Sequence, residues 1–190
     1  MDGPTLLALT TALATGEPVF VPWRRDVAAA LPALHTAIAA FDPGARLAAH
    51  ASALWLRDHA LDAPPTSATR LLVQDATLLG FYALANGQAE LSSTHQKRLG
   101  SRRPTQPAVV LTQIARHVAA PPGTGRLLFE DAVHIARRAS LLSAATILAL
   151  DPYDDATADM WRGRYRFAAS RMPVRPGADL KRLWLPLERG

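Results

Sequence analysis

A short loop rich in proline and glycine carries the residues of this chain that are best suited to bind an anion. It runs from Ala119 to Gly125, reads AAPPGTG, and is followed directly by Arg126. Glycine lets a ligand approach the backbone closely, and the N–H groups at the start of a helix attract phosphate. Arg126 adds a fixed positive charge. The pattern predicts a phosphate-binding loop, although Gly-Thr-Gly before a helix can also be only a tight turn.

The segments on either side of this loop have the patterns of a strand and a helix. Before it, the run from Val109 to Ala115 is apolar and rich in β-branched residues, as in a buried strand. After it, apolar residues recur at steps of four and three, which predicts an amphipathic helix. The expected inward face is Leu128, Ala132, Ile135, Ala139 and Leu142, and the expected outward face is Arg126, Glu130, His134 and Arg137. A strand, loop and helix in this order can present several backbone N–H groups to a phosphate.

Other phosphate and metal motifs are excluded by the residues present. A Walker A loop ends in Gly-Lys-Ser/Thr, whereas Arg126-Leu127 follows here. A dinucleotide fingerprint needs a third glycine and a later acidic residue. The chain has no Cys, which excludes disulfides and thiolate chemistry, and its six His do not have the spacing of a metal site. We therefore predict no metal. The acidic cluster Asp151, Asp154, Asp155 and Asp159 is explained most simply by helix capping and solvation.

Charge is distributed unevenly along the chain. Residues 1–96 carry a net charge of −3 and residues 97–190 a net charge of +8. The basic residues gather in a polar stretch before the central strand and in a late segment that also holds aromatic residues; they include Lys97, Arg98, Arg102, Arg103, Arg162, Arg164 and Arg166. Such a half-chain suits an anionic partner, for example a nucleic acid or a phosphorylated cofactor. A solvated surface explains the same charges.

Length and composition predict one domain, with or without an extension. The chain has 190 residues, 49% of them hydrophobic, which is ample for a core. No apolar run approaches the ~20 residues of a membrane span, and the N-terminal residues do not have the pattern of a secretory signal. We expect a cytoplasmic protein without a membrane partner.

The remaining elements complete an α/β or α+β domain built on a mixed sheet. We expect helices at 6–13, 26–41 and 47–61, the second weakened by Pro32, and a short strand at 18–21 that ends at Pro22. A hairpin joins strands at 71–73 and 78–84, and a further turn is expected at Asn86-Gly87. Residues 92–106 have the pattern of an exposed loop. Beyond the amphipathic helix we expect a buried strand at 144–150, a helix capped by Asp154 that reaches about Arg164, and a last strand at 183–187.

This order of motifs resembles the GNAT acetyltransferase superfamily, and more narrowly the acetyltransferase toxins of bacterial toxin–antitoxin modules. The resemblance covers roughly Phe41 to Leu187. Its marks are Leu54-Trp55-Leu56-Arg57 with Ala60-Leu61, Gly80-Phe81-Tyr82-Ala83-Leu84, the central strand, the glycine loop, Asp151, and Leu183-Trp184-Leu185-Pro186. The resemblance implies the GNAT fold, in which a central mixed sheet flanked by helices splays into a V at the acetyl-CoA site. It also implies an N-terminal helical extension at 1–40 and an acetyltransferase domain at 41–190.

Site residues follow from the same resemblance. The acetyl-CoA pyrophosphate would lie on the glycine loop, and the pantetheine arm would pair with the end of the central strand. The implied cofactor-binding residues are Ile114, Ala115, Arg116, Pro122, Gly123, Thr124, Gly125 and Arg126. A backbone N–H near that strand would stabilise the developing oxyanion.

The chain departs from the family pattern at three places. Ala120 stands where the loop motif normally begins with Gln or Arg, and the loop is about one residue shorter. His117 follows the strand where Asp is usual, and could act as a base or be an ordinary strand-end histidine. The late helix lacks the Phe-Tyr pair whose Tyr protonates the leaving thiolate, so Tyr165 is our candidate general acid, with Tyr153 as the alternative. Tyr165 could also be a packing group.

The favoured hypothesis is an acetyl-CoA-dependent N-acetyltransferase that acts on a primary amine, by analogy the amino group of aminoacyl-tRNA. Lys97, Arg98, Arg162, Arg164 and Arg166 would then belong to one basic surface that holds the tRNA phosphates. An antitoxin protein and a homodimer are further partners that the resemblance implies. One alternative is a GNAT-fold protein that has lost acetyl transfer and acts as a CoA-binding or interaction module, because the usual Tyr is missing. The other is a basic nucleic-acid-binding protein without a cofactor.

Overall fold

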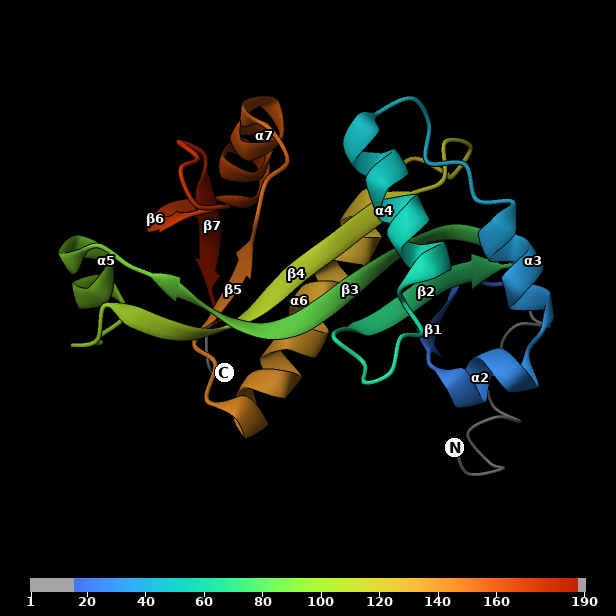
Figure 1. The fold of residues 1–190 in the computed structure, drawn as a ribbon, viewed down its shortest axis with the longest axis horizontal. Helices are drawn as coiled ribbons and strands as arrows, with labels where there is room; N and C mark the ends of the chain where they lie inside the picture. Colours follow the sequence, from blue (N-terminus) through green and yellow to red (C-terminus); the bar gives the residue numbers. More distant parts are fainter. Residues whose placement is uncertain (1–15, 188–190) are drawn as a thin grey trace. The chain divides into compact units, whose positions relative to one another are not determined.

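The structure is a computed structural model that describes residues 16–187 (Figure 1). The helix expected at 6–13 lies outside these residues. The helices are α2 (Arg25–Ala30), α3 (Ala33–Ala39), α4 (Leu47–Asp58), α5 (Ser93–Arg98), α6 (Thr124–Ser143) and α7 (Asp155–Tyr165). The strands are β1 (Val19–Trp23), β2 (Ala68–Gln74), β3 (Thr77–Glu90), β4 (Thr105–Arg116), β5 (Ile147–Leu150), β6 (Ala168–Pro173) and β7 (Lys181–Pro186).

The strands form one mixed sheet in the order β1-β2-β3-β4-β5-β7-β6. β4 and β5 are parallel, whereas the pairs β1–β2, β5–β7 and β6–β7 are antiparallel. The connection from β4 to β5 therefore has to cross over, and α6 provides it. A mixed sheet flanked by helices confirms the predicted fold class.

The chain divides into two compact units. The first unit comprises the residues up to Ala83 together with Gln113–Glu130, and the second comprises Leu84–Thr112 and the residues from Asp131 onward. Three elements, β3, β4 and α6, contribute residues to both. The boundary at residue 40 that the resemblance implies stays a prediction.

Each unit has its own hydrophobic core. In the first, buried residues of β1, β2 and β3 pack with α2, α3 and α4; they include Val21, Val27, Leu34, Leu56, Leu71 and Phe81. In the second, β4, β5 and β7 contribute Val110, Ile147, Ala149 and Trp184 to a smaller cluster with Leu91. Because β5 is buried along its whole length, its continuous apolar sequence is explained.

Several predicted elements are confirmed. The hairpin turn falls at Asp75-Ala76, where both residues have positive φ (47° and 59°), as in a type I′ turn. The strand before the glycine loop is β4, the helix after it is α6, and the two later strands are β5 and β7. Asp154 caps α7 by accepting a hydrogen bond from Thr157 N at 2.7 Å. The edge strand β6 was not predicted from the sequence.

Three of the predicted boundaries are wrong. The helix expected at 26–41 is broken into α2 and α3 at Leu31-Pro32, because proline lacks an N–H and clashes with the preceding turn. β1 continues through Pro22, which an edge strand tolerates. β3 does not turn at Asn86-Gly87 but runs on to Glu90. A Cβ on Gly87 would lie 2.6 Å from Val110 Cγ2 of β4, so this glycine allows β3 to pack closely against the Val110 side chain.

The remaining errors concern an element and two helix faces. The expected loop at 92–106 contains α5, whose cap residue Ser92 accepts from His95 N at 3.3 Å. On α4, where the sequence predicts that Leu54 and Trp55 point inward, the buried residues are Ser52, Ala53 and Leu56, and Leu54 is 54% exposed. On α6 a buried stripe follows steps of four, through Leu128, Ala132, Ala136 and Ser140, and Phe129 is buried beside it. Leu142 lies off this stripe, because each residue turns the helix by about 100°, and it is 94% exposed.

In the first unit, β3 lies very close to the two elements that flank the glycine loop, β4 and α6. At Gly80 of β3, a Cβ would lie 2.7 Å from Leu128 Cδ1 and 2.8 Å from the carbonyl oxygen of Ala115. The missing side chain at this position therefore lets the end of β4 and the first turns of α6 lie tightly against β3.

We expect Gly80→Ala to destabilise the fold by about 1–3 kcal/mol, because both neighbours are packed and one is backbone. Urea unfolding followed by circular dichroism measures the change. Gly163→Ala on α7 is the matched control, since a Cβ there meets open space, and we expect it to be neutral or slightly stabilising. Equal stability of the Gly80→Ala variant and the wild type would contradict this account of the packing.

Candidate functional site

The loop between β4 and α6 presents backbone donors at the start of a 20-residue helix. Gly123 has a φ of +92°, and Gly125 lies in the first helical turn. Within residues 16–187, the N–H groups of Gly123 and Gly125 donate to no acceptor. Two unsatisfied donors at the positive end of a helix dipole form a site that suits a phosphate.

Hydrogen bonds within the loop hold these two donors in place. Thr124 is buried, and both its N–H (3.2 Å) and its hydroxyl (2.7 Å) donate to the carbonyl oxygen of Pro121. The N–H groups of Arg126 and Leu127 donate to the carbonyl oxygen of Gly123 at 2.9 and 3.0 Å. The loop is therefore ordered by its own contacts. The resemblance implied that Thr124 binds the cofactor, but its hydroxyl is already engaged in holding the loop.

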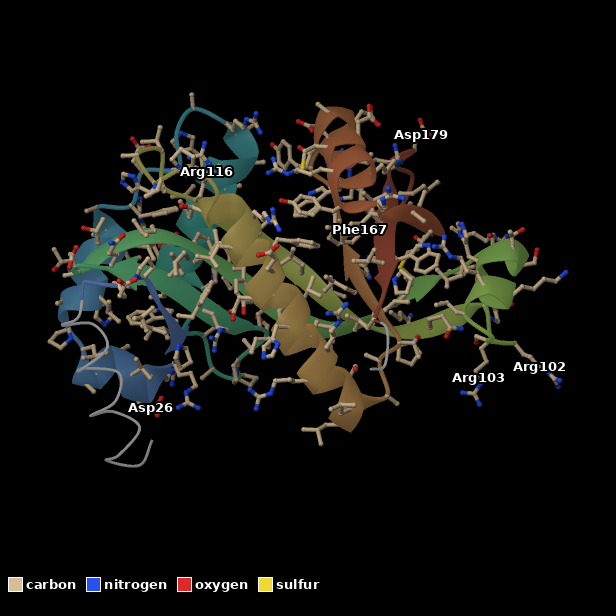
Figure 2. All side chains as sticks on the ribbon, turned by 180° about the vertical axis from the view of Figure 1, so that it is seen from behind. Asp26, Arg102, Arg103, Arg116, Phe167 and Asp179 are labelled. Atoms are coloured by element: carbon tan, nitrogen blue, oxygen red, sulfur yellow. The ribbon has the colours of Figure 1, made fainter. Side chains whose placement is uncertain are left out.

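Two arginines flank the loop. Arg126 projects from the first turn of α6, and its Nε donates to Glu130 at 2.7 Å. Arg116 ends β4 and lies beside the start of α6 (Figure 2). Its Nη1 donates to the carbonyl oxygens of His117 and Val118 at 3.3 and 3.5 Å, and its Cδ lies 3.9 Å from the position of a Cβ on Gly125. The resemblance implies a role only for the backbone of Arg116, in pairing with the pantetheine arm; its guanidinium is a second cation at the loop.

The end of β4 offers backbone groups to a ligand. β4 pairs with β5 from Ala108 opposite Ile147 to Leu111 opposite Leu150, where β5 ends. β4 continues to Arg116, so the residues Ile114–Arg116 have no partner in β5. An extended ligand arm can pair with such a strand end as an added strand would. The role that the resemblance implies for these three residues stays a prediction.

In the second unit, the end of α7 gathers aromatic and basic side chains. The ring of Tyr165 lies 5.0 Å from that of Trp161, and Trp161 also contacts Phe167. The guanidinium of Arg164 lies 5.6 Å from the centre of the Tyr165 ring. Trp161 is buried and Tyr165 is half-buried, so both rings contribute to packing, and the Tyr165 hydroxyl is the phenol nearest this helix end. Tyr153, the alternative candidate, is 53% exposed and precedes the helix.

The basic residues of the second unit form two separate groups. Arg162 and Arg164 occupy the last turn of α7, and Arg166 caps it. Lys97 and Arg98 occupy the last turn of α5, and Arg102 and Arg103 follow. Figure 2 shows Arg102 and Arg103 far from Phe167, which directly follows the cap of α7. The expectation of one continuous basic surface is not supported by this arrangement.

An ion pair that the sequence did not reveal ties three strands of the second unit together. Arg182 of β7 donates to both carboxylate oxygens of Asp151, at 2.7 and 2.6 Å, and to the carbonyl oxygen of Gln88 at 2.7 Å. The hydrogen bond to Asp151 raises the pKa of the Arg182 guanidinium above its ordinary value. No local pattern predicts a pair separated by 31 residues. Asp151 therefore has a structural partner, as Asp154 and Asp159 do.

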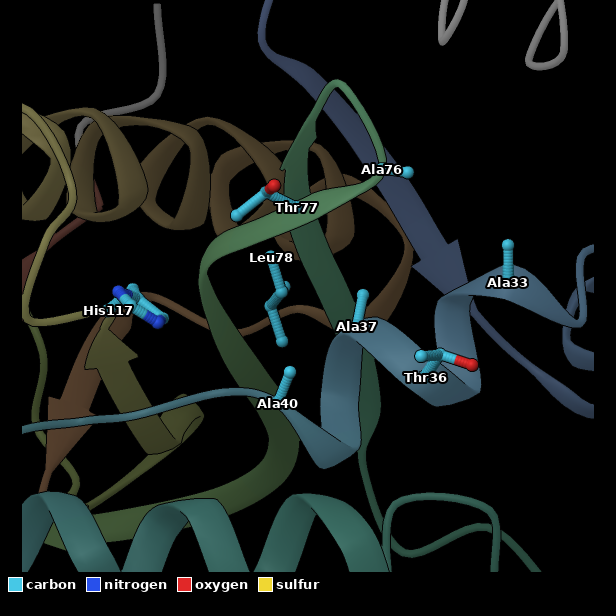
Figure 3. A pocket seen from close by; sticks show the side chains of 8 residues that line it. All are labelled: Ala33, Thr36, Ala37, Ala40, Ala76, Thr77, Leu78 and His117. Carbon is cyan, nitrogen blue, oxygen red and sulfur yellow. The ribbon is translucent and has the colours of Figure 1, made fainter.

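His117 lies at the corner between β4 and the glycine loop. Its ring Nδ1 accepts a hydrogen bond from Ala119 N at 3.0 Å, and the ring packs edgewise on Phe41. The ring also lines a pocket of about 390 Å³ with residues of α3 and the start of β3 (Figure 3). Residues 16–187 contain no group of three His, Asp or Glu that could hold a metal ion, and no helix among them is long and apolar enough to cross a membrane.

No family model and no curated protein sequence match the chain. Solved structures do. A Tyr-to-Phe mutant of KacT superposes with a TM-score of 0.63 at 21% identity, over 79% of this chain and 87% of that one. AtaT in complex with acetyl-methionyl-tRNA gives a TM-score of 0.63 at 19% identity, over 78% and 86% of the two chains. A Tyr-to-Phe mutant of the toxin AtaT, bound to the C-terminus of the antitoxin AtaR and to acetyl-CoA, gives a TM-score of 0.61 at 17% identity, over 90% and 94%.

These matches agree with the architecture built above from strand order, crossover helix and glycine loop. At such low identity they establish the fold. The chain has the GNAT fold, which it shares with KacT and with the toxin AtaT, as the order of its sequence motifs predicts.

Proposed function

We propose that this protein binds acetyl-CoA and transfers its acetyl group to a primary amine. The observation that carries the proposal is the pair of unsatisfied N–H groups of Gly123 and Gly125, between Arg116 and Arg126, on a fold that holds acetyl-CoA in a structure of AtaT. A pyrophosphate carries the charge and the acceptor oxygens that this loop lacks. The backbone of Ile114–Arg116 would pair with the pantetheine arm and direct the thioester along β4.

The reaction follows from the chemistry of a thioester and an amine. The neutral amine attacks the thioester carbonyl, a C–N bond forms, and the C–S bond breaks as CoA leaves. The amine loses a proton and the thiolate gains one, so no oxidant or reductant is needed. The backbone at the end of β4 would donate to the oxyanion. Tyr165 is the proposed donor of the proton to the leaving sulfur.

For the acceptor we propose the amino group of an aminoacyl-tRNA. Support comes from the complex of AtaT with acetyl-methionyl-tRNA and from the three arginines at the end of α7. Phosphate groups of the tRNA would pair with these guanidiniums. The proposal extends to an antitoxin partner, because AtaT is bound to AtaR in a structure of the same fold.

A specific observation favours one other function. At the position of the family's Phe-Tyr pair, this chain has Met160-Trp161 or Trp161-Arg162. The first residue of the loop motif, a polar Gln or Arg in the family, is the buried Ala120 here. A protein that binds acetyl-CoA without turning it over would have these features. Cofactor binding and turnover therefore have to be measured separately. A basic nucleic-acid-binding protein without a cofactor would show neither acetyl-CoA binding nor acetyl transfer.

We expect Gly125→Glu to abolish acetyl-CoA binding in isothermal titration calorimetry. The change places a carboxylate where the pyrophosphate would lie, and the negative charge also opposes the phosphate. His134→Glu is the matched control, since it adds the same side chain at an exposed position of the same helix and should bind as the wild type does. Unchanged affinity in a folded Gly125→Glu variant would refute the loop as the pyrophosphate site.

We expect Tyr165→Phe to lower kcat by about 100-fold while acetyl-CoA affinity stays nearly constant, since a general acid contributes on this order. Release of CoA thiol with an amine acceptor gives the rate. Tyr153→Phe is the control and should turn over normally. If Tyr153→Phe lost activity and Tyr165→Phe kept it, the role would belong to Tyr153. An inactive wild type that still binds acetyl-CoA would favour the binding-only function.

We expect the triple change of Arg162, Arg164 and Arg166 to Glu to weaken binding of charged tRNA by roughly tenfold or more at low salt and to reduce the slope of log Kd against log salt. Filter binding across a salt series measures both. The matched control is Arg102 and Arg103 to Glu, which reverses charge far from α7 (Figure 2). If both variants bound as the wild type does, a small amine would be the better substrate hypothesis.

A further inference from the structure

Hydrogen bonds of one residue, His117, hold much of the corner that joins β4 to the glycine loop, and Val118 N adds one by donating to the carbonyl oxygen of Asp42 at 2.8 Å. The N–H of His117 continues the ladder to β3 by donating to the carbonyl oxygen of Leu79 at 2.8 Å. Its carbonyl oxygen accepts from Ala120 N at 3.1 Å and from Arg116 Nη1 at 3.3 Å. Its ring Nδ1 accepts from Ala119 N at 3.0 Å. His117 therefore fixes the path of the chain over the first three residues after the strand.

The last of these hydrogen bonds depends on the protonation state of the ring. A backbone N–H can donate to Nδ1 only when that nitrogen carries a lone pair, so the imidazole is neutral with its proton on Nε2. A second proton would occupy Nδ1, so that this N–H and the N–H of Ala119 would both be donors and would face each other. Histidine is the side chain that ordinarily takes up a proton between pH 5 and 8.

We propose that His117 is a positioning residue for the phosphate loop, and that its protonation releases Ala119 and loosens the loop. This inference rests on the proposed function only where it concerns acetyl-CoA affinity. The ordered loop binds one proton fewer than the loosened one. Falling pH therefore favours the loosened loop, and rising pH favours the arrangement that presents Gly123 and Gly125.

The surroundings of the ring allow this change of charge. The ring is half-buried and lines the pocket in Figure 3, whose other walls are Ala, Thr and Leu side chains without charge. The rings of Phe41 and His117 pack in a T-shaped arrangement with their centres 5.7 Å apart. The carbonyl oxygen of Phe41 accepts a hydrogen bond from the Arg57 guanidinium. Arg116 lies on the carbonyl side of His117, and the carboxylate of Asp42 accepts from Gly44 N. No carboxylate of residues 16–187 contacts the His117 ring, so nothing there compensates a protonated imidazole.

Substitutions can separate the acceptor from the titration. In His117→Asn, the amide oxygen stands near the place of Nδ1 and can accept from the N–H two residues later, as in an Asx turn, but it does not titrate. In His117→Phe, the ring keeps its contact with Phe41 and the acceptor is lost. His134→Asn removes an exposed histidine of α6 and serves as the control.

The first measurement uses the protein without any ligand. In ¹H–¹⁵N spectra recorded from pH 5.5 to 8.5, the amides of Ala119, Gly123 and Gly125 should titrate together with the His117 ring. These shifts should persist in His134→Asn and vanish in His117→Asn. Loop amides that do not respond to pH, or that titrate equally in His117→Asn, would overturn the inference whatever the protein binds.

The second measurement is calorimetry with acetyl-CoA over the same pH range. From pH 7.5 to 5.5 the wild type should lose about fivefold more affinity than His117→Asn, as expected for one hydrogen bond. The comparison with Asn is needed because a phosphate monoester of CoA also titrates near pH 6. His117→Phe should bind weakly throughout. Equal pH dependence in wild type and His117→Asn would refute the effect on affinity, whereas no binding at any pH would refute the proposed function and leave the spectra to decide on His117.

Discussion

The first turn of an α-helix leaves backbone N–H groups without partners, and this constraint organises the candidate site. In most helices a side chain or water satisfies these groups. Here Thr124 uses its hydroxyl to hold Pro121 instead, and glycines occupy the positions whose donors remain unsatisfied. Gly80 allows β3, β4 and α6 to meet closely beneath the loop. The position of the donors thus depends on packing in the first unit as well as on the loop residues themselves.

Much of this arrangement can be predicted from the sequence, because the patterns that indicate it lie in neighbouring residues. An apolar β-branched run, a proline–glycine loop and a helical period follow one another directly along the chain, so neighbouring residues alone indicate the strand, the loop and the helix. The hairpin turn and the Asp154 cap belong to the same class of signal. Pro32 also indicates the break between α2 and α3, because proline lacks the N–H that a continuous helix would need there. The expected continuous helix gave too much weight to the apolar period.

What the sequence could not provide depends on contacts between distant residues. Asn86-Gly87 has the composition of a turn, yet β3 runs through it because Val110 fills the space beside the glycine. The phase of the buried face of α6 differs from the predicted one by a fraction of a turn, enough to leave Leu142 in solvent. The Asp151–Arg182 pair and the contact of the His117 ring with Ala119 have no sequence signature at all. The same holds for the side chain of Arg116, whose contacts at the start of α6 no local pattern indicates.

The cap of α7 has a consequence for engineering. Arg166 adopts a left-handed conformation (φ 59°, ψ 31°), which glycine would occupy with about 1 kcal/mol less strain. Its charge lies at the negative end of the helix dipole, together with Arg162 and Arg164, and gains a few tenths of a kcal/mol or more from that field. A design effort guided by thermal stability alone would replace this arginine with glycine at an early stage. It would remove, in the same step, one third of the positive charge at the helix end, so thermostability and anion affinity would have to be selected together at this position.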